Sequence, residues 1–248
     1  MAKKTDSNVY TIVFSIAMVV VVGSLLAFIA SSLKPTITEN ERYEKQQNIL
    51  YAMGVNNNES SSDVTFIPTT EVEAVFQQYI AKQYVIKGGA VSEDNEAYLI
   101  DLAKEESMDK DERRYPLFVG EKDGETYYIV PMRGKGLWDA IWGYIAVDKD
   151  FVVKGVFFDH KGETPGLGAN IKERYFMDDF KGEHILSNSG DFQGIAVAKG
   201  NADPVNNRKE DHKVDALAGA TITGDGVSAM IQKYLRTYLP YIKKIKNQ

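Results

Sequence analysis

The sequence of 248 residues contains no cysteine. This absence excludes disulfide bonds, cysteine nucleophiles and cysteine-ligated iron–sulfur clusters together. Histidine is also scarce, because His160, His184 and His212 are scattered along the chain without an HExxH motif or a paired spacing. We therefore expect no metal site, and any redox chemistry must rely on a non-metal cofactor or on haem.

The chain also has no excess of basic residues. The chain has 29 Lys and Arg residues against 35 Asp and Glu, which gives a net charge of -6. Because a nucleic-acid backbone requires a basic face, nucleic acid is not an expected partner. The hydrophobic fraction of 44% and the charged fraction of 26% are ordinary for a protein that folds around a core.

Charged residues are absent from Ser7 to Leu33. This segment is long enough to cross a hydrocarbon core, which requires about 20 apolar residues. A cleaved signal peptide is the alternative, because Ala30-Ser31-Ser32 resembles a cleavage site, but such peptides have a shorter apolar core of about 7–15 residues. We therefore expect an uncleaved transmembrane helix over residues 9–33.

The basic residues around this segment indicate its orientation. Lys3 and Lys4 precede it, whereas Lys34 is followed by acidic and basic residues together. Because lysine and arginine collect on the cytoplasmic side, we expect residues 1–8 in the cytoplasm and the large domain outside it.

Residues 34–63 are expected to form a juxtamembrane helix and a linker. The segment Thr38-Glu39-Asn40-Glu41 has the spacing of a capping box, and Gly54 is a typical helix stop, so we expect a polar helix between them. The run VNNNESSSD, residues 55–63, is a polar linker rich in residues that compete with helix formation.

Residues 64–248 are expected to form one α+β domain with a mostly antiparallel sheet and flanking helices. A second capping box, Thr70 to Glu73, predicts a helix with an apolar stripe from Val72 to Ile80. Turn signals at Asp123-Gly124 and Asp148 to Asp150 predict hairpins. The expected strands are the apolar runs at 97–102, 115–119, 126–131, 144–147, 151–158 and 194–199.

Three glycine-containing segments fall between these expected elements: MRGKGLW (132–138), HKGETPGLGA (160–169) and AGATITGDG (218–226). Glycine lets the main chain approach a ligand closely, so these loops are candidate walls of a pocket, although each could also be only a tight turn. Asp225 stands where a P-loop requires lysine, and none of the segments completes a dinucleotide-binding fingerprint.

The segment from Asp215 onward contains two threonines before an expected helix. Apolar residues recur at helical spacing from Val227 to Tyr238, and Thr223 is a suitable N-cap, so we expect the helix to begin at about Gly224. Thr221 would then lie just before a helix N-terminus, where free N–H groups and the helix dipole favour a phosphate.

The motif DALAGAT, residues 215–221, resembles the Dxx(S/T)GAT motif at which a flavin transferase esterifies FMN, through its phosphate, to the final threonine. Ala218 stands where that motif usually has Ser or Thr. The segments GKGLW and HKGETPGLG resemble the two other signature loops of the same FMN-binding domain. With its N-terminal apolar segment and its length, the chain resembles the C-subunit family of the Na⁺-translocating NADH:quinone reductase (Nqr complex), over nearly the whole sequence.

The resemblance implies FMN attached covalently to Thr221. Leu137, Trp138 and Leu167 would line the flavin ring, and Trp138 would share a helical face with Trp142 if that segment is a helix. Glu163, Thr164 and the main chain of Gly166 to Gly168 would bond the polar edge of the ring or the ribityl chain. The remaining positions of the implied site are Asp215, Gly219, Ala220, Thr223 and Gly136.

The resemblance further implies an electron-transfer subunit of a membrane NADH:quinone oxidoreductase that exports Na⁺ and reduces ubiquinone. Its partners would be the other membrane and redox subunits and a flavin transferase, and it would be inactive alone. It would lie in the bacterial inner membrane with the large domain on the periplasmic side. The alternatives are the related G-type subunit of an Rnf-type ion-translocating complex, a membrane-anchored flavin-binding module without turnover, and an extracytoplasmic hydrolase, for which the sequence offers no convincing Ser/His/Asp grouping.

Overall fold

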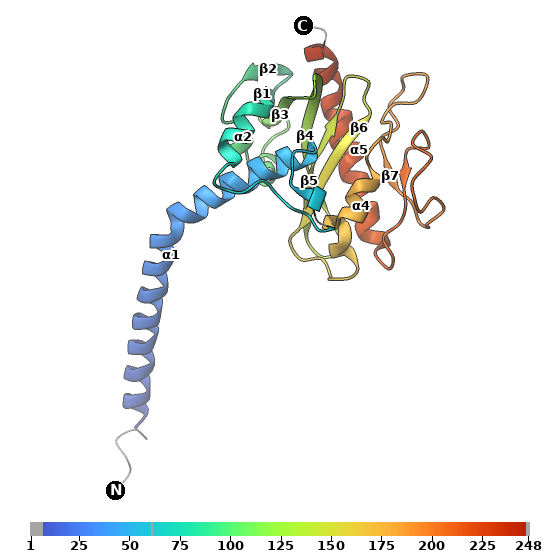
Figure 1. Cartoon of the computed structure of the whole chain (residues 1–248). Coiled ribbons are helices and arrows are strands. Elements are labelled where there is room, and N and C mark those ends of the chain that lie inside the picture. Colours follow the sequence, from blue (N-terminus) through green and yellow to red (C-terminus); the bar gives the residue numbers. More distant parts are fainter. Residues whose placement is uncertain (1–6, 61, 247–248) are drawn as a thin grey trace. The chain divides into compact units, whose positions relative to one another are not determined.

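The computed structural model describes residues 7–60 and 62–246 (Figure 1). Most of the expected cytoplasmic segment, residues 1–8, therefore lies outside the described residues. The chain forms two compact units, Met1–Arg42 and Tyr43–Gln248. Residues 43–63, which we expected between the membrane and the domain, thus belong to the second unit.

The first unit consists of the N-terminal part of helix α1 (Asn8–Ala52). Its most apolar stretch of 18 residues has a mean hydropathy of 2.8 and is not buried within the protein. By length and composition α1 is able to cross a membrane.

The expected helix start at the capping box of Thr38 is wrong, because α1 runs without interruption through Pro35 and Thr38. Proline removes only one hydrogen bond of a helix, and its fixed φ of about -65° is itself helical. A long helix can therefore continue through a single proline, and the capping side chains have no free helix end to satisfy.

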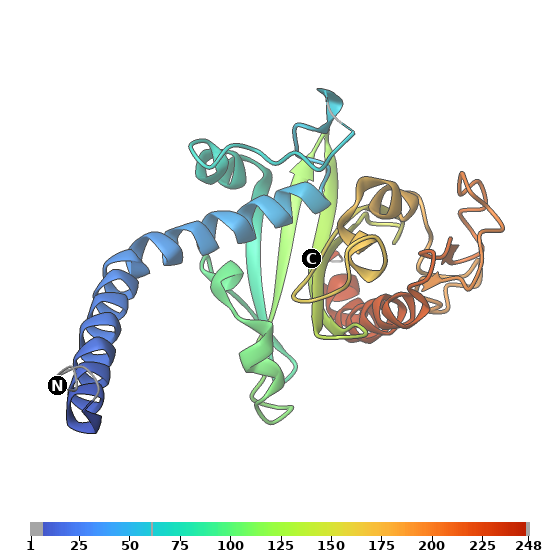
Figure 2. The same cartoon turned by 90° about the horizontal axis from the view of Figure 1, so that it is seen from below.

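The second unit is built on a six-stranded antiparallel sheet of order β2-β1-β3-β4-β5-β6 (Figures 1 and 2). Its mostly antiparallel character confirms the predicted fold class. The strands are β1 (Ile80–Lys87), β2 (Ala90–Glu93), β3 (Tyr115–Lys122), β4 (Glu125–Lys135), β5 (Ala140–Val147) and β6 (Val153–His160). A separate parallel pair consists of β7 (Ala196–Val197) and β8 (Lys213–Val214).

Short helices connect the strands, and one long helix ends the chain. The α-helices of the second unit are α2 (Val72–Tyr79), α3 (Leu102–Glu106), α4 (Arg174–Asp179) and α5 (Thr221–Lys246). The 3₁₀ helices are η2 (Asn58–Ser60), η3 (Ala97–Leu99) and η4 (Gly168–Lys172).

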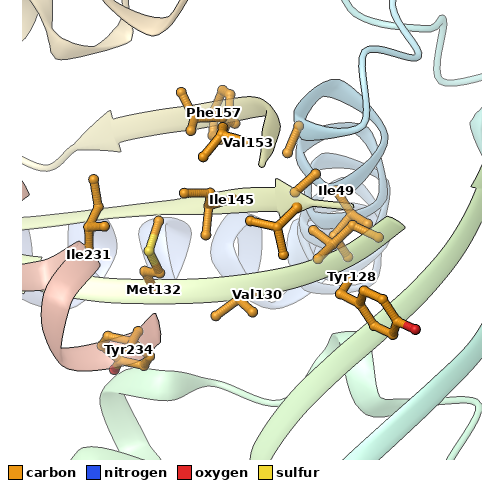
Figure 3. Close-up of a cluster of buried hydrophobic side chains, with 14 of the residues drawn as sticks. Ile49, Tyr128, Val130, Met132, Ile145, Val153, Phe157, Ile231 and Tyr234 are labelled. Carbon is orange, nitrogen blue, oxygen red and sulfur yellow. The ribbon is translucent and has the colours of Figure 1, made fainter. Parts of the chain in front are cut away.

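The two faces of the sheet carry different helices. On one face the last turns of α1 contribute Tyr51, whose ring packs 5.9 Å from that of Phe157 on β6. On the other face α5 packs on β4, where Met230 lies against Gly134. Figure 3 shows the buried side chains between these layers, with Met132 and Ile145 beside residues of α5 and Ile49 of α1 nearby. The buried side chains of α5 pack against the sheet, and this packing determines where the N-terminus of α5 lies.

Several sequence expectations fail locally. The run 97–102, expected as a strand, forms η3 and leads into α3. The stripe of the helix expected from Val72 ends one residue early, because Ile80 begins β1, and the N-cap residue Glu71 makes no side-chain capping bond. Trp138 and Trp142 share no helical face, because Trp138 lies in a loop and Trp142 lies on β5.

Candidate functional site

The three glycine-containing loops meet at one end of the sheet. The first joins β4 to β5, whose residues Lys135 and Ala140 are paired, and the second follows His160, which pairs with Ile141 on β5. The third leads into α5, and Gly226 in the second turn of α5 lies against the main chain of Lys135. Segments about 80 residues apart in the sequence therefore form one site.

Glu163 lies at the centre of this site. Its Oε1 accepts the main-chain N–H of Trp138 at 2.9 Å, and its Oε2 accepts the hydroxyl of Thr223 at 2.5 Å. The side chain is only 4% exposed. We expected Glu163 to bond the flavin, but the protein itself occupies both carboxylate oxygens.

The hydrogen bonds to Glu163 keep its carboxylate charged. Burial alone would raise the pKa of Glu163, but the Thr223 hydroxyl and the N–H groups of Trp138, Leu137 and Asp139 outweigh it and hold the pKa below its ordinary value. The loop 137–139 therefore closes around a negative charge.

Two of the motif glycines leave room for this carboxylate. A Cβ on Gly136 would lie 2.6 Å from Glu163 Oε1, and a Cβ on Gly168 would lie 2.4 Å from Oε2. A side chain at either position would therefore force the carboxylate to move. We expected these glycines to admit a ligand, whereas here they admit a carboxylate from the neighbouring loop.

The two threonines take different positions at the start of α5. Thr221 is the first residue of the helix and is exposed. Thr223 lies inside the first turn, is 1% exposed and donates to Glu163. The expected start at Gly224 with Thr223 as N-cap is therefore wrong. Thr223 has a buried partner 60 residues away in the sequence.

The main chain before Thr221 forms a tight turn that exposes the helix N-terminus. Gly219 has a φ of 68°, in the left-handed region that favours glycine. The Ala220 carbonyl accepts the N–H of Gly224 at 2.9 Å as the first α-helical bond. The N–H groups of Thr221, Ile222 and Thr223 then have no acceptor within the helix, as at any helix start.

Large apolar side chains are exposed around this turn. Leu137 is 45% exposed, Trp138 66%, Leu167 42% and Ile222 58%, although such residues usually prefer the interior. The side chain of Leu167 packs directly against the turn at Gly219, because a Cβ on Gly219 would lie 2.8 Å from Leu167 Cδ2. The indole N–H of Trp138 donates to the Thr164 hydroxyl at 3.2 Å, which ties the two signature loops together.

The loop of Thr164 to Gly168 is folded by its own main chain. The Thr164 carbonyl accepts the N–H groups of Leu167 and Ala169, both at 3.1 Å, and Gly166 has a φ of 76°. This turn presents Leu167 outward while Gly168 stays buried beside Glu163.

Asp215 holds a neighbouring loop. Its Oδ1 accepts the main-chain N–H of Ala202 at 3.1 Å and that of Asp203 at 3.2 Å. Its other oxygen, Oδ2, is buried and has no hydrogen-bond partner within the described residues. Ala218, three residues later, is exposed. Asp215 thus ties the main chain at 202–203 to the segment that leads into the turn before Thr221.

Two contributors to the site were missed from the sequence. His160 accepts the main-chain N–H of Glu163 at its Nδ1, at 3.2 Å, and the Lys135 carbonyl forms the surface on which Gly226 lies. His160 stands three residues before Glu163 at the end of β6, and that proximity was the one available signal.

These residues fit a phosphate-bearing cofactor with an apolar ring. The free N–H groups and the dipole at the start of α5 suit a phosphate, Thr221 offers an exposed hydroxyl, and the exposed apolar side chains suit an aromatic ring. Among residues 7–60 and 62–246, no group of three or more His, Asp or Glu side chains could hold a metal ion.

The sequence is similar to those of known proteins over most of its length. Residues 136–236 match the family model of the FMN-binding domain. A curated relative, the C-type subunit of the Na⁺-translocating NADH-quinone reductase of Pseudomonas aeruginosa, is 29% identical over 93% of this chain and 92% of its own length.

Two crystal structures resemble the fold. The C-type subunit of the Na⁺-translocating NADH-quinone reductase from Parabacteroides distasonis has a TM-score of 0.70 and 33% identity, covering 85% of this chain and 96% of that one. NqrC from Shewanella oneidensis has a TM-score of 0.66 and 28% identity, covering 83% of this chain and 99% of that one.

Proposed function

The chain belongs to the NqrC family of the Na⁺-translocating NADH-quinone reductase, and from this we propose that it is an electron-transfer subunit of such a complex, carrying FMN bound covalently to Thr221. When bound, FMN supplies one-electron transfer. The linkage is a phosphate ester between the threonine Oγ and the FMN phosphate, which leaves the flavin ring unmodified.

The position of Thr221 is the observation that carries this proposal. Its hydroxyl is exposed on the first residue of a helix of 26 residues, beside main-chain N–H groups without intrahelical acceptors. A phosphate attached there would meet the positive end of the helix dipole. Thr223, the other threonine of the motif, is buried and bonded to Glu163, so its hydroxyl is not offered to a transferase.

In this proposal, different residues around Thr221 contact the flavin ring, contact the ribityl chain or shape the attachment turn. Leu137, Trp138 and Leu167 would pack against the flavin ring. Thr164 and the main chain of Gly166 to Gly168 would contact the polar edge of the ring or the ribityl chain. The motif residues that shape the attachment turn would be Asp215, Gly219 and Ala220, and Gly136 leaves room for the buried carboxylate of Glu163.

Helix α1 would anchor the subunit as a single span over residues 9–33. Residues 1–8 would lie in the cytoplasm, and the FMN-binding domain would lie on the periplasmic side of the bacterial inner membrane. The support is the charge-free stretch of α1 and the basic residues before it. Outside the cytoplasm a covalent bond prevents the loss of a soluble cofactor.

The subunit would act only within its complex. Electrons would pass between its flavin and the redox groups of the other membrane subunits, whereas NADH oxidation and Na⁺ export would require those partners. A flavin transferase would be needed for maturation. The subunit alone would therefore show no NADH:quinone reductase turnover.

The test is flavin fluorescence of the denatured polypeptide on a gel, after expression of the full chain together with a flavin transferase. We expect a fluorescent band for the wild type and for Thr223→Ser, and a dark band for Thr221→Ala. A dark wild-type band would mean that the chain binds flavin without covalent attachment or does not bind it.

A further inference from the structure

Glu163 joins the loop that carries Trp138 to the helix that carries Thr221. One carboxylate oxygen accepts the Trp138 N–H at 2.9 Å, and the other accepts the hydroxyl of Thr223, two residues after Thr221, at 2.5 Å. Because the carboxylate is 4% exposed and both oxygens are occupied, it is not presented to a ligand.

We infer that Glu163 is a positioning residue of the flavin site: without touching the flavin, it holds Trp138 at a fixed place relative to the attachment point Thr221. The inference rests on the proposed function, because this spacing matters only if the flavin is attached at Thr221. A ring on a flexible ribityl tether has many orientations, and a fixed aromatic neighbour restricts them.

The contacts around Glu163 show that its place is built into several elements. Cβ atoms on Gly136 and Gly168 would lie within 2.6 Å of its carboxylate oxygens, so a side chain at either position would displace the carboxylate from its present place. His160 holds the main chain of Glu163 itself through its Nδ1, at 3.2 Å. Glu163 thus connects the end of β6 through its main chain, and the loop before β5 and the first turn of α5 through its carboxylate.

The charge of Glu163 adds a second consequence. Hydrogen bonds hold the pKa of Glu163 below its ordinary value, so the group is ionised at neutral pH. A fixed negative charge near the flavin opposes the gain of negative charge on reduction. Neutralising it should therefore make the flavin easier to reduce, which a purely structural contact would not predict.

Four variants and one control separate the effect of position from that of charge. Glu163→Ala removes every bond of the carboxylate. Glu163→Gln keeps the shape and removes the charge: its amide oxygen can accept the Trp138 N–H, and its NH2 group can donate to the Thr223 hydroxyl. Thr223→Val breaks the bond to α5 alone, and Thr223→Ser restores it. Lys161→Met is the matched control, because it removes an exposed ion pair to Asp139 in the same monitored loop, at 3.2 Å, and leaves the carboxylate of Glu163 in place.

The first measurement is hydrogen exchange of a peptide covering residues 136–140 in the full chain, in a flavin-free Thr221→Ala background. We expect exchange of the Trp138 region to be about ten-fold faster or more in Glu163→Ala, since hydrogen bonds to a charged group are lost. Thr223→Val should accelerate it to a smaller extent, and Thr223→Ser and Lys161→Met should leave it near the parent rate. Exchange at the parent rate in both Glu163→Ala and Thr223→Val would overturn the inference.

The second measurement uses the flavin-loaded chain, as fluorescence anisotropy of the ring and as midpoint potential. We expect Glu163→Ala to lower the anisotropy while Thr221 stays modified, and Glu163→Gln to raise the potential. Unchanged anisotropy in Glu163→Ala would contradict a positioning role. A wild-type chain without covalent flavin would instead refute the proposed function, and the exchange measurement would still decide the role of Glu163.

Discussion

Gly226 of α5 lies directly against the carbonyl of Lys135 at the end of β4. A Cβ on Gly226 would lie only 2.3 Å from that oxygen, a distance no side chain can occupy. This close approach places the first turns of α5, and with them Thr221, beside the loop that carries Trp138. The site therefore depends on one helix–strand contact that requires glycine.

We predict that Gly226→Ala destabilises the domain by about 3 kcal/mol, since the overlap is with main chain that has little room to move. Without a clash, alanine would stabilise the helix by about 1 kcal/mol relative to glycine. A loss of stability would therefore show that the new Cβ clashes with the Lys135 carbonyl. The measurement is urea unfolding followed by circular dichroism. The control is Gly162→Ala, where the nearest atom to the new Cβ would be Asp139 Cβ at 3.7 Å, and a similar loss there would count against the explanation.

Substitutions at Thr223 distinguish a helix cap from a buried hydrogen bond. We expect Thr223→Ala to cost about 1–3 kcal/mol, because the buried carboxylate of Glu163 loses a donor. Thr223→Ser should retain most of the stability. Asparagine is among the best N-cap residues, yet Thr223→Asn should destabilise strongly beside Gly168. Equal stability of the Asn and Thr proteins in chemical denaturation would restore the capping interpretation.

Glu183 should make stability depend on pH. This carboxyl is completely buried, and burial raises its pKa from the ordinary 4.5 to about 7, despite the bond from Asn206 and the nearby charge of Lys209. Asp211 and Asp179 add to the increase. A raised pKa means that the stabilising contribution of the protonated group is complete below 4.5 and is lost as the pH rises to about 7.

We therefore expect Glu183→Gln to be more stable than the wild type at pH 8, by an amount on the order of 3 kcal/mol. Near pH 4 the two proteins should differ little. The check is the free energy of unfolding measured between pH 4 and pH 8 for both proteins. A constant difference across this range would show that Glu183 does not titrate there.

Trp138→Ala tests whether the exposed indole serves the flavin or the fold. The side chain is 66% exposed, so its removal should change the free energy of unfolding by only about 0.5 kcal/mol. The flavin should stay attached to Thr221, but its absorption and fluorescence should shift toward those of free FMN. Met108→Ala, at another exposed apolar residue, is the control and should leave the flavin spectrum unchanged. A wild-type spectrum in Trp138→Ala would remove Trp138 from the site.

The sequence predicted the general plan because its signals are local. The turn at Asp123-Gly124 connects β3 and β4 as expected, and both residues have positive φ angles, 54° and 78°. The apolar stripe from Val227 to Tyr238 is the buried face of α5. In each case the pattern that specifies the element lies within the element.

The failures arise where a distant partner decides the local structure. Thr223 satisfies the N-cap pattern, but its hydroxyl bonds to Glu163, and no periodicity within α5 reports a carboxylate 60 residues away. Glu163 in turn looks like a ligand-binding residue because it lies in a glycine-rich loop. Only the folded arrangement shows that both of its oxygens serve the protein.

β1 and β2 illustrate a second limit. The residues of β1 begin at Ile80, which also continues the apolar stripe of α2, so the helical pattern obscured the start of the strand. The turn at Gly88-Gly89 between them, with φ angles of 54° and 83°, was the missed signal. β1 pairs with β3 on one side and with β2 on the other, so β2 is the edge of the sheet.

The central claim is that FMN is attached to Thr221 and not to Thr223. The most direct measurement is peptide mass mapping of residues 215–233 from the full chain expressed together with a flavin transferase. We predict the FMN increment on Thr221, with Thr223 unmodified, in the wild type and in Thr223→Ser. An unmodified peptide in the wild type, or an increment on Thr223, would contradict the account.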